Sequence, residues 1–407
     1  MSDPVTYRAR DLYLFIVSRF ITTMAIQVQS VAIGWQIYDM ARTPFALGLV
    51  GLCQFVPMFL LTLPAGDISD RHNQRFVYSL AAGLQTICAA LFLGLSIFRP
   101  HEIILFYAVL VLFGAARGFS GPSGQSLLPF LVPPEKLPRS IAVNVSAFNG
   151  AVIAGPAIGG FLYLMGPVPV YSLCIAGFAF SALIVSGLGG RRYVPEKTLA
   201  TRAERVAEGV RFVRSRPVVL GAISLDLFAV LLGGATALMP VYARDILHTG
   251  PNGLGLLRSA PAAGAFVMGA LLASWPIRRH VGAKMFAAVA IFGLATIVFG
   301  ISRSFDVSLV ALFVLGAADL VSVNIRAALI QLSTPDTMRG RVSSVSQLFI
   351  GASNELGEFE SGITAGLLGT VPSVVAGGIG TLLVVAGWMK LFPALKRVSS
   401  FNDVARP

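Results

Sequence analysis

The sequence predicts an all-α membrane protein in which twelve membrane-spanning helices form two pseudo-symmetric six-helix bundles. Three observations lead to this fold class: an apolar composition, apolar segments of membrane-spanning length, and an internal repeat. Of the 407 residues, 55% are hydrophobic and only 12% are charged, whereas a soluble domain carries about 25% charged residues. The solvent for most of this chain is therefore lipid.

The apolar segments supply the twelve predicted spans. A helix needs about 20 mostly apolar residues to cross the hydrocarbon layer. Segments of this kind lie at 11–38, 46–65, 76–98, 103–125, 140–164, 168–189, 217–243, 253–274, 284–303, 306–330, 341–368 and 372–393. We therefore predict a first bundle over 1–189, a linker over 190–216 and a second bundle over 217–407.

The linker is the longest polar stretch of the chain. Val206, Val210 and Val213 share one helical face, and arginines fill several positions between them. This pattern predicts an amphipathic cytoplasmic helix that lies on the membrane surface and joins the two halves. Binding of a partner protein is the alternative.

Loop charges set the predicted orientation. Most loop Lys and Arg fall on one side, whereas the other side carries only Arg42, Arg99, Arg244 and Arg303. Because basic loops stay in the cytoplasm, both termini are predicted there, in a multi-pass protein of the cell (inner) membrane. The same bias explains the net charge of +12 without a nucleic-acid partner.

An internal repeat relates the two halves. A shift of 202 places Gly155 and Gly160 on Gly357 and Gly362, and a shift near 207 places "LGL" at 47–49 on "LGL" at 254–256. Six spans separate the copies, and six is even, so both copies have the same orientation in the membrane.

The repeat also shows that buried charges differ between the halves. Arg19 corresponds to Asp226, and Arg117 corresponds to Asp319. An ion at the bilayer centre costs at least ~2.5–3.5 kcal/mol, so each one should face a partner or water. We expect a polar cavity between the halves, with Arg19 and Arg117 pairing with Asp226 and Asp319. For Arg19 the alternative is that its side chain extends to the cytoplasmic surface.

Three glutamates interrupt the eleventh span. On a helix, Glu355 and Glu358 lie about 60° apart, whereas Glu360 lies some 140° from Glu355. Two close carboxylates in a low dielectric should not both stay charged, so one should hold a proton at neutral pH. Glu355, Glu358, Asp226 and Asp319 are the candidates for proton coupling. The alternatives for the glutamates are a salt bridge, with Arg258 or Arg326, and contact with a cationic substrate.

Further polar residues within the spans are candidates to line the cavity or to contact the substrate. Some of them are expected to form interhelical hydrogen bonds instead, worth about 0.6 kcal/mol each. With Arg19 and Arg117, this set comprises Gln27, Gln29, Asn144, Asn149, Asn324 and Asn354.

The loop "GDISDRHNQR" at 66–75 resembles the cytoplasmic signature of the major facilitator superfamily, matching it at Gly66, Asp70, Arg71 and Arg75. Asn73 and Gln74 depart from the signature. The resemblance implies a gate in which Asp70 meets the start of the eleventh span when the cavity faces outward. There Asp70 could pair with Arg341. The alternative is that the loop charges only set the topology.

The segment "GAVIAGPAIGG" at 150–160 resembles the antiporter motif of that superfamily. The matching residues are Gly150, Gly155, Pro156, Gly159 and Gly160. Small residues also let helices pack closely, and this reading is compatible with transport. Within the superfamily, the chain resembles most the enterobactin-exporter group with its macrolide-efflux relatives. That resemblance implies alternating access and export driven by the proton gradient.

The predicted function is therefore that of a proton-coupled exporter (antiporter) of a small organic molecule, such as a siderophore or a drug. The alternatives are an uptake carrier or uniporter and, less favoured, a non-transporting receptor. An enzyme is not expected, because no nucleophile–base pair, metal cluster or phosphate loop appears in the sequence. We expect no cofactor and no metal. The expected partners are the substrate, protons and the lipid bilayer, and the protein is expected to be a monomer.

Overall fold

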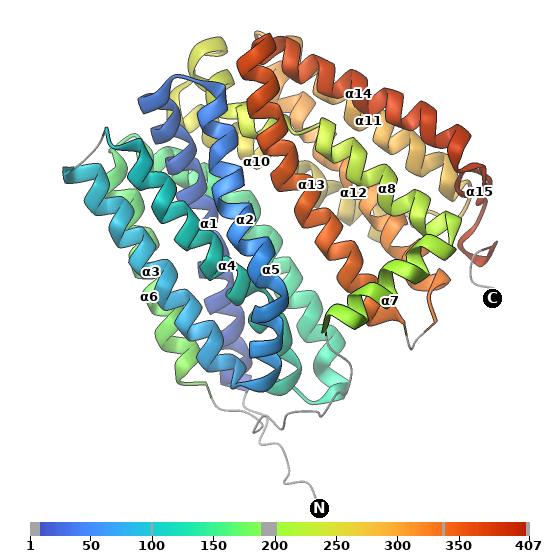
Figure 1. Cartoon of the computed structure of the whole chain (residues 1–407), viewed down its shortest axis with the longest axis horizontal. Coiled ribbons are helices and arrows are strands. Elements are labelled where there is room, and N and C mark those ends of the chain that lie inside the picture. Colours follow the sequence, from blue (N-terminus) through green and yellow to red (C-terminus); the bar gives the residue numbers. More distant parts are fainter. Residues whose placement is uncertain (1–8, 99–100, 189–201, 336–337, 404–407) are drawn as a thin grey trace, which may run out of the picture. The chain divides into compact units, whose positions relative to one another are not determined.

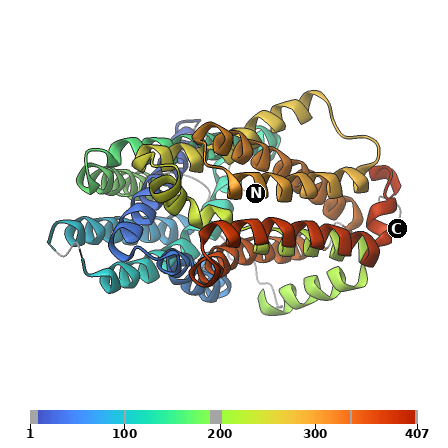
Figure 2. The same cartoon turned by 90° about the horizontal axis from the view of Figure 1, so that it is seen from above.

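A computed structural model describes residues 9–98, 101–188, 202–335 and 338–403, and over these residues it contains helices and no β-strand (Figures 1 and 2). The helices of the first half are α1 (Ala9–Ala41), α2 (Pro44–Arg71), α3 (Gln74–Phe98), α4 (Ile103–Leu131), α5 (Leu137–Tyr163) and α6 (Pro167–Ser186). The linker forms α7 (Arg202–Ser215).

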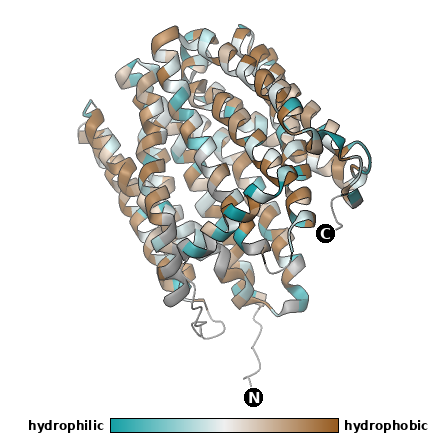
Figure 3. Cartoon of the chain, turned by 45° about the vertical axis from the view of Figure 1, so that its right-hand side comes forward, coloured by the Kyte–Doolittle hydropathy of each residue, from teal (hydrophilic) through white to brown (hydrophobic). Residues whose placement is uncertain are grey.

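The described part of the second half contains eight further α-helices, two of which are short. They are α8 (Pro217–Leu232), α9 (Met239–Val241), α10 (Gly250–Ser274), α11 (Val281–Ile301), α12 (Phe305–Ser333), α13 (Arg339–Leu368), α14 (Thr370–Leu391) and α15 (Pro393–Arg397). Each of the twelve predicted spans lies on helical segments, the seventh with a break, which confirms the predicted fold class. Hydrophobic positions cover most of these ribbons (Figure 3).

Eleven helical stretches among the described residues are long and apolar enough to cross a membrane. The predicted span that falls outside this set is α13. It is 30 residues long, which is more than enough for a span, but it carries two arginines and three glutamates. Ionisable residues within a membrane span are expected to have a function, so α13 is a candidate for the functional site.

The seventh span is interrupted, whereas the sequence predicted one continuous helix over 217–243. Helix α8 ends at Leu232, and a 3₁₀ turn (Ala235–Leu238), α9 and a π-helical turn (Tyr242–Ile246) follow. Gly233 and Gly234 lie at the break and favour a helix less than other residues do. A Cβ atom on Gly234 would collide with the carbonyl group of Gly357 on α13, so the glycine lets α13 pass closely.

The chain divides into two compact units. The first contains residues 1–42, 53–199 and 250–259, and the second contains 43–52, 200–249 and 260–407. The start of α2 thus packs with the second unit, and the start of α10 packs with the first. Of the predicted linker, residues 190–201 lie outside the described residues.

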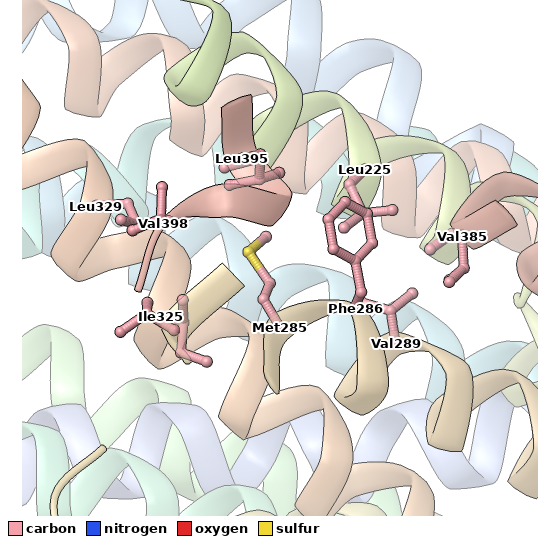
Figure 4. Close-up of a cluster of buried hydrophobic side chains, with 12 residues drawn as sticks. Leu225, Met285, Phe286, Val289, Ile325, Leu329, Val385, Leu395 and Val398 are labelled. Carbon is pink, nitrogen blue, oxygen red and sulfur yellow. The ribbon is translucent and has the colours of Figure 1, made fainter. Parts of the chain in front are cut away.

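Each unit has its own hydrophobic core. In the first unit, α1 packs on α5 and α6, and α3 packs on α4 and α6. Phe15, Tyr78 and Leu127 are central to one of its clusters. In the second unit, α11 packs on α12 and α14, and α8 packs on α13 and α14. The cluster in Figure 4 joins five helices there through Leu225 (α8), Met285 and Phe286 (α11), Ile325 and Leu329 (α12), Val385 (α14) and Leu395 (α15).

The structure repeats equivalent contacts in the two units. Helices α4 and α12 have bounds that differ by 202 at both ends. In the first unit, Gly114 of α4 lies against the backbone of Gln54 on α2. In the second unit, Gly316 of α12 lies against the backbone of Pro261 on α10. These residues are related by the shifts of 202 and 207 that the sequence shows, so the pseudo-symmetry is structural.

A second pair of glycine contacts follows the same rule. Gly160 of α5 meets Gly255 of α10 within the first unit, and Gly362 of α13 meets Gly48 of α2 within the second. The shift of 202 relates Gly160 to Gly362, and the shift of 207 relates Gly48 to Gly255. The same two helix crossings are therefore built twice from small residues.

The linker helix forms as predicted, but its apolar face packs on protein. Val213 is buried with Val219, Val342 and Val345. A Cβ atom on Gly209 would lie 2.8 Å from the carbonyl oxygen of Arg341. The expectation that this helix lies on the membrane surface is therefore wrong for its apolar face, because that face covers the start of α13 and the start of α8.

The glycine crossings predict a specific loss of stability. In Gly316→Ala, the new methyl group would overlap the backbone of Pro261, which no rotamer change can relieve. We expect a loss of about 1–3 kcal/mol in the free energy of unfolding, measured as a lower Tm of the detergent-purified protein. In the control Gly83→Ala, the methyl group meets nothing within 4 Å, so Tm should not fall. Equal Tm values for wild type and Gly316→Ala would contradict the close crossing.

Candidate functional site

The most deeply buried ion pair among the described residues joins α8 to α12. Asp226 Oδ1 contacts Arg326 Nη1, and the two residues are 6% and 3% exposed. Both residues belong to the second unit. The predicted pairing of Asp226 with Arg19 is therefore wrong in this structure, because Arg326 of the same unit takes up the carboxylate. Arg326, one of the two alternative partners considered for the glutamates of α13, is therefore paired with Asp226.

Arg19 lies on α1 and reaches across to α4. A Cβ atom on Gly124 would collide with Arg19 Nη1, and it would lie 3.1 Å from Cε2 of Tyr78 on α3. The Arg19 guanidinium thus fills the space that the missing side chain of Gly124 leaves. Within the described part of the chain, no acidic side chain forms an ion pair with Arg19, which is only partly buried.

Arg117 lies further out on α4. Its Nη1 donates a hydrogen bond to Gln54 Oε1 on α2 at 3.1 Å. The close approach of Gly114 to Gln54 brings the two helices near enough for this contact. Asp319, the residue equivalent to Arg117, is partly buried on α12. The pairing of Arg117 with Asp319 stays a prediction.

The acidic segment of α13 faces two different helices. Glu358 lies against α2, since a Cβ atom on Gly51 would be 3.1 Å from Glu358 Oε2 and 3.4 Å from the Glu355 carbonyl oxygen. Gly357 packs instead on α8, where its Cβ atom would lie 3.0 Å from the Leu231 carbonyl oxygen. Glu355 and Glu358 are both partly buried. Two carboxylates thus sit in a tightly packed part of a predicted membrane span, the setting in which protonation is coupled to packing.

The first unit contains a polar seam that the sequence analysis missed in part. Ser18 Oγ lies 2.5 Å from Ser181 Oγ, Thr22 donates to Ser181 Oγ at 2.8 Å, and Tyr78 donates to Thr22 at 3.3 Å. These groups join α1, α3 and α6 through hydrogen bonds inside the bundle. Such bonds fix the packing of spans that apolar contacts alone leave poorly specified.

The seam continues along α1. Gln36 accepts a hydrogen bond from Tyr171 at 2.9 Å and donates one to Ser96 at 2.9 Å. Gln29 lies one heptad before Gln36, is 1% exposed, and its amide has no hydrogen-bond partner among the described residues. Thr22, Gln29 and Gln36 follow one another at intervals of seven residues, which places them on one face of α1. This spacing is the signal in the sequence from which the polar face could have been predicted.

The remaining cavity candidates differ in their burial. Gln27 packs against α5, where a Cβ atom on Gly155 would lie 2.6 Å from the Cβ atom of Gln27. Asn144 is partly buried, with an Oδ1 atom that lacks a hydrogen-bond partner in the described chain. Asn149, Asn324 and Asn354 are exposed. Their role in substrate contact stays a prediction.

The glycines of the antiporter motif lie at helix crossings. A Cβ atom on Gly159 would be 2.9 Å from the Cα atom of Val28 on α1, and Gly155 faces the same helix. Gly160 faces α10, whereas Gly150 and Pro156 belong to the same helix α5. The packing role of these glycines is visible directly, and their role in exchange stays a prediction.

The gate motif is described only in part. Arg75 Nη1 donates to the Leu188 carbonyl oxygen, and Arg341 Nη1 lies 2.8 Å from Glu208 Oε2 of α7. The surroundings of Gly66 and the side chains of Asp70 and Arg71 lie outside what the structure describes. The described His, Cys, Asp and Glu residues include no group of three that could hold a metal ion.

A family profile described as transmembrane secretion effector matches residues 9–406. The chain belongs to this family. Similar curated proteins include the enterobactin exporter EntS of Citrobacter koseri, which is 26% identical over 389 residues, covering 93% of this chain and 91% of the relative. The enterobactin exporter EntS of Escherichia coli O1:K1 is 26% identical over 376 residues, covering 90% of this chain and 88% of the relative.

Solved structures share the fold. A bacterial homologue of the human lysosomal transporter Spinster, inward-facing and occupied, gives a TM-score of 0.73 at 16% identity, covering 97% of this chain and 98% of that one. An inward-facing bacterial homologue of the iron transporter ferroportin gives 0.71 at 17% identity, covering 93% and 98%. This protein is therefore a multi-pass membrane transporter of the major facilitator superfamily that resembles the EntS group.

The buried pair predicts a strong dependence of stability on both partners. Asp226→Asn leaves the Arg326 guanidinium buried without a counter-charge, which should cost about 3–5 kcal/mol of unfolding free energy. Replacing both residues, with Asp226→Leu and Arg326→Met, should restore most of that loss because no charge remains buried. Thermal unfolding of the purified transporter measures both effects.

The control for this prediction is Asp306→Asn at the exposed start of α12, where a change within about 0.5 kcal/mol is expected. A double variant no more stable than Asp226→Asn would show that Arg326 does not need the carboxylate.

Proposed function

We propose that this protein is a proton-coupled exporter, an antiporter that moves a small organic molecule out of the cell by alternating access. It acts in the cell (inner) membrane as a monomer with both termini in the cytoplasm, and it has no enzymatic activity. The observation that carries the proposal is the pair Glu355 and Glu358 in α13, inside a transporter of a secretion family.

Membership of the secretion family and the similarity to enterobactin exporters support export and a siderophore-like or drug-like substrate. The runner-up is an uptake carrier or uniporter, which the duplicated fold also permits. Direction and substrate are therefore the first quantities to measure.

The carboxylates of α13 are the preferred proton carriers. Glu358 lies against Gly51 at one of the two repeated helix crossings, a turn away from the contact between Gly48 and Gly362. A negative charge at such a crossing is unfavourable in a low dielectric, and protonation removes that penalty. Proton binding would thereby favour close packing of α13 on α2, and proton release would favour separation. Asp319 is the next candidate for a proton carrier. Asp226 ranks below it, because its ion pair with Arg326 gives it a structural role.

The cytoplasmic gate is the second part of the proposal. Asp70 is proposed to meet the start of α13 in the outward-facing state and to pair there with Arg341. In this structure Arg341 is bound by Glu208 of the linker helix at 2.8 Å. Arg341 would thus pair with Asp70 in the outward-facing state and with Glu208 in the state of this structure. Because each pairing favours a different state, the linker helix would take part in the transport cycle.

Export is tested by comparing spent media. A strain that lacks the gene should lose at least one small organic molecule from its medium, and the wild-type gene should restore it. Mass spectrometry of the medium and of cell extracts measures both pools, and the molecule should accumulate inside the mutant cells. Faster depletion of a molecule from the medium by the complemented strain would favour the uptake carrier instead.

Proton coupling is tested with the molecule found in that comparison. In proteoliposomes, Glu355→Gln or Glu358→Gln should lower the rate of substrate-driven proton movement by roughly tenfold or more. The reason is that glutamine cannot accept the proton, so the contribution of that group to proton transfer is lost. A pH-sensitive dye inside the vesicles records the flux. Glu360→Gln is the matched control on the same helix and should leave the coupling unchanged. Full coupling in both glutamine variants would remove these residues as carriers.

A further inference from the structure

The repeat gives an unusual comparison between equivalent positions of the two units. The shift of 207 relates Arg19 on α1 to Asp226 on α8, and the shift of 202 relates Gly124 on α4 to Arg326 on α12. The structure supports both assignments, because the equivalent residues touch in both units. Asp226 contacts Arg326, and Arg19 Nη1 lies at the position of the absent Gly124 side chain.

The same place in the fold therefore holds two different charge arrangements. In the second unit an acid and a base neutralise each other. In the first unit the acid is replaced by Arg19 and the base by Gly124, so a cation remains. No described acidic side chain neutralises it.

Burial at the equivalent positions argues against simple extension of Arg19 to the membrane surface. Asp226 and Arg326 lie at the equivalent positions of the second unit and are only 6% and 3% exposed. The Arg19 side chain also points across the unit, toward α4 and the ring of Tyr78. An arginine that extends to lipid headgroups would instead follow its own helix outward.

We propose that Arg19, whose guanidinium fills the space beside Gly124, forms an anion subsite for the transported molecule. The subsite holds a carboxylate, phenolate or phosphate group of that molecule. This proposal rests on the proposed transport function and specifies its substrate class. An intramembrane cation needs a counter-charge, and the guanidinium offers a planar fork for an oxyanion. The Arg19 side chain is only partly buried, so part of it stays accessible to a ligand. The subsite is the counterpart of the fixed pair Asp226–Arg326, with the substrate supplying the missing acid.

The test measures binding to the purified full-length protein, so it does not depend on transport. The protein is kept in dodecyl maltoside, which contains no phosphate. Saturation-transfer NMR with benzoate, and thermal stabilisation by inorganic phosphate, report anion binding. Benzamide is the neutral probe of the same shape as benzoate.

We expect saturable binding of at least one anion, weakened by at least about tenfold in Arg19→Gln, since a charge-assisted hydrogen bond contributes on the order of one decade or more. Arg19→Lys should keep part of the binding. The double variant Arg19→Asp with Gly124→Arg copies the pair of the second unit, so it should fold normally and lose anion binding. Benzamide should show no dependence on Arg19.

Several results would overturn the subsite. These are the absence of binding of both anions to wild type, equal anion binding by Arg19→Gln, or retained binding in the folded double variant. A further arm adds phosphatidylglycerol, and displacement of benzoate by this lipid through Arg19 would identify the anion as a headgroup rather than a substrate. Anion binding that needs Arg19 in a protein without export activity would refute the proposed function and leave the subsite in place.

Discussion

The free energy of an ion in hydrocarbon is the constraint on which the rest of this structure depends. A charge within a span must be paired, hydrated or protonated, and each of these solutions has its own place in the chain. Asp226 and Arg326 are paired and almost fully buried. Arg117 donates a hydrogen bond to the amide oxygen of Gln54, whereas the guanidinium of Arg19 packs against Gly124. The glutamates of α13 are the proposed site of protonation.

Close helix crossings are the second constraint, and they explain why the fold tolerates so many glycines. Where backbones touch, as Gly316 and Pro261 do, a methyl group would not fit. Since lipid tails are as apolar as the side chains, such close packing holds spans together where the hydrophobic effect cannot. The repetition of these crossings in the second unit shows that the duplicated sequence kept the contacts and varied the charges around them.

Apolar length, loop charge and the two shifts were enough to predict the twelve spans, the linker helix and the pseudo-symmetry, because each depends on pattern alone. The break after Leu232 was not predictable, since a glycine pair is common in unbroken spans and only the approach of α13 makes it necessary. The partner of Asp226 was missed because a repeat relates equivalent positions and does not say which neighbours touch. The seam of Ser18, Thr22 and Gln36 was overlooked because short polar residues hardly lower the hydropathy of a span.

The distribution of charge over a duplicated scaffold also bears on how exchange can work. Transport of a proton in one direction and a substrate in the other needs each occupancy to alter the affinity for the other, and this coupling is reciprocal. The candidate proton carriers lie in α13 and α12, whereas Arg19, which has no acidic partner among the described residues, lies in α1. If Arg19 takes an anionic group, the cycle brings in a negative charge each time substrate loads, and release of a proton from a glutamate adds a second one. Like charges oppose each other, so by charge alone an anionic substrate would favour a protonated glutamate. An antiporter needs the reverse, that the two occupancies disfavour each other, so the proposed exchange has to come from the alternation between states and not from charge repulsion.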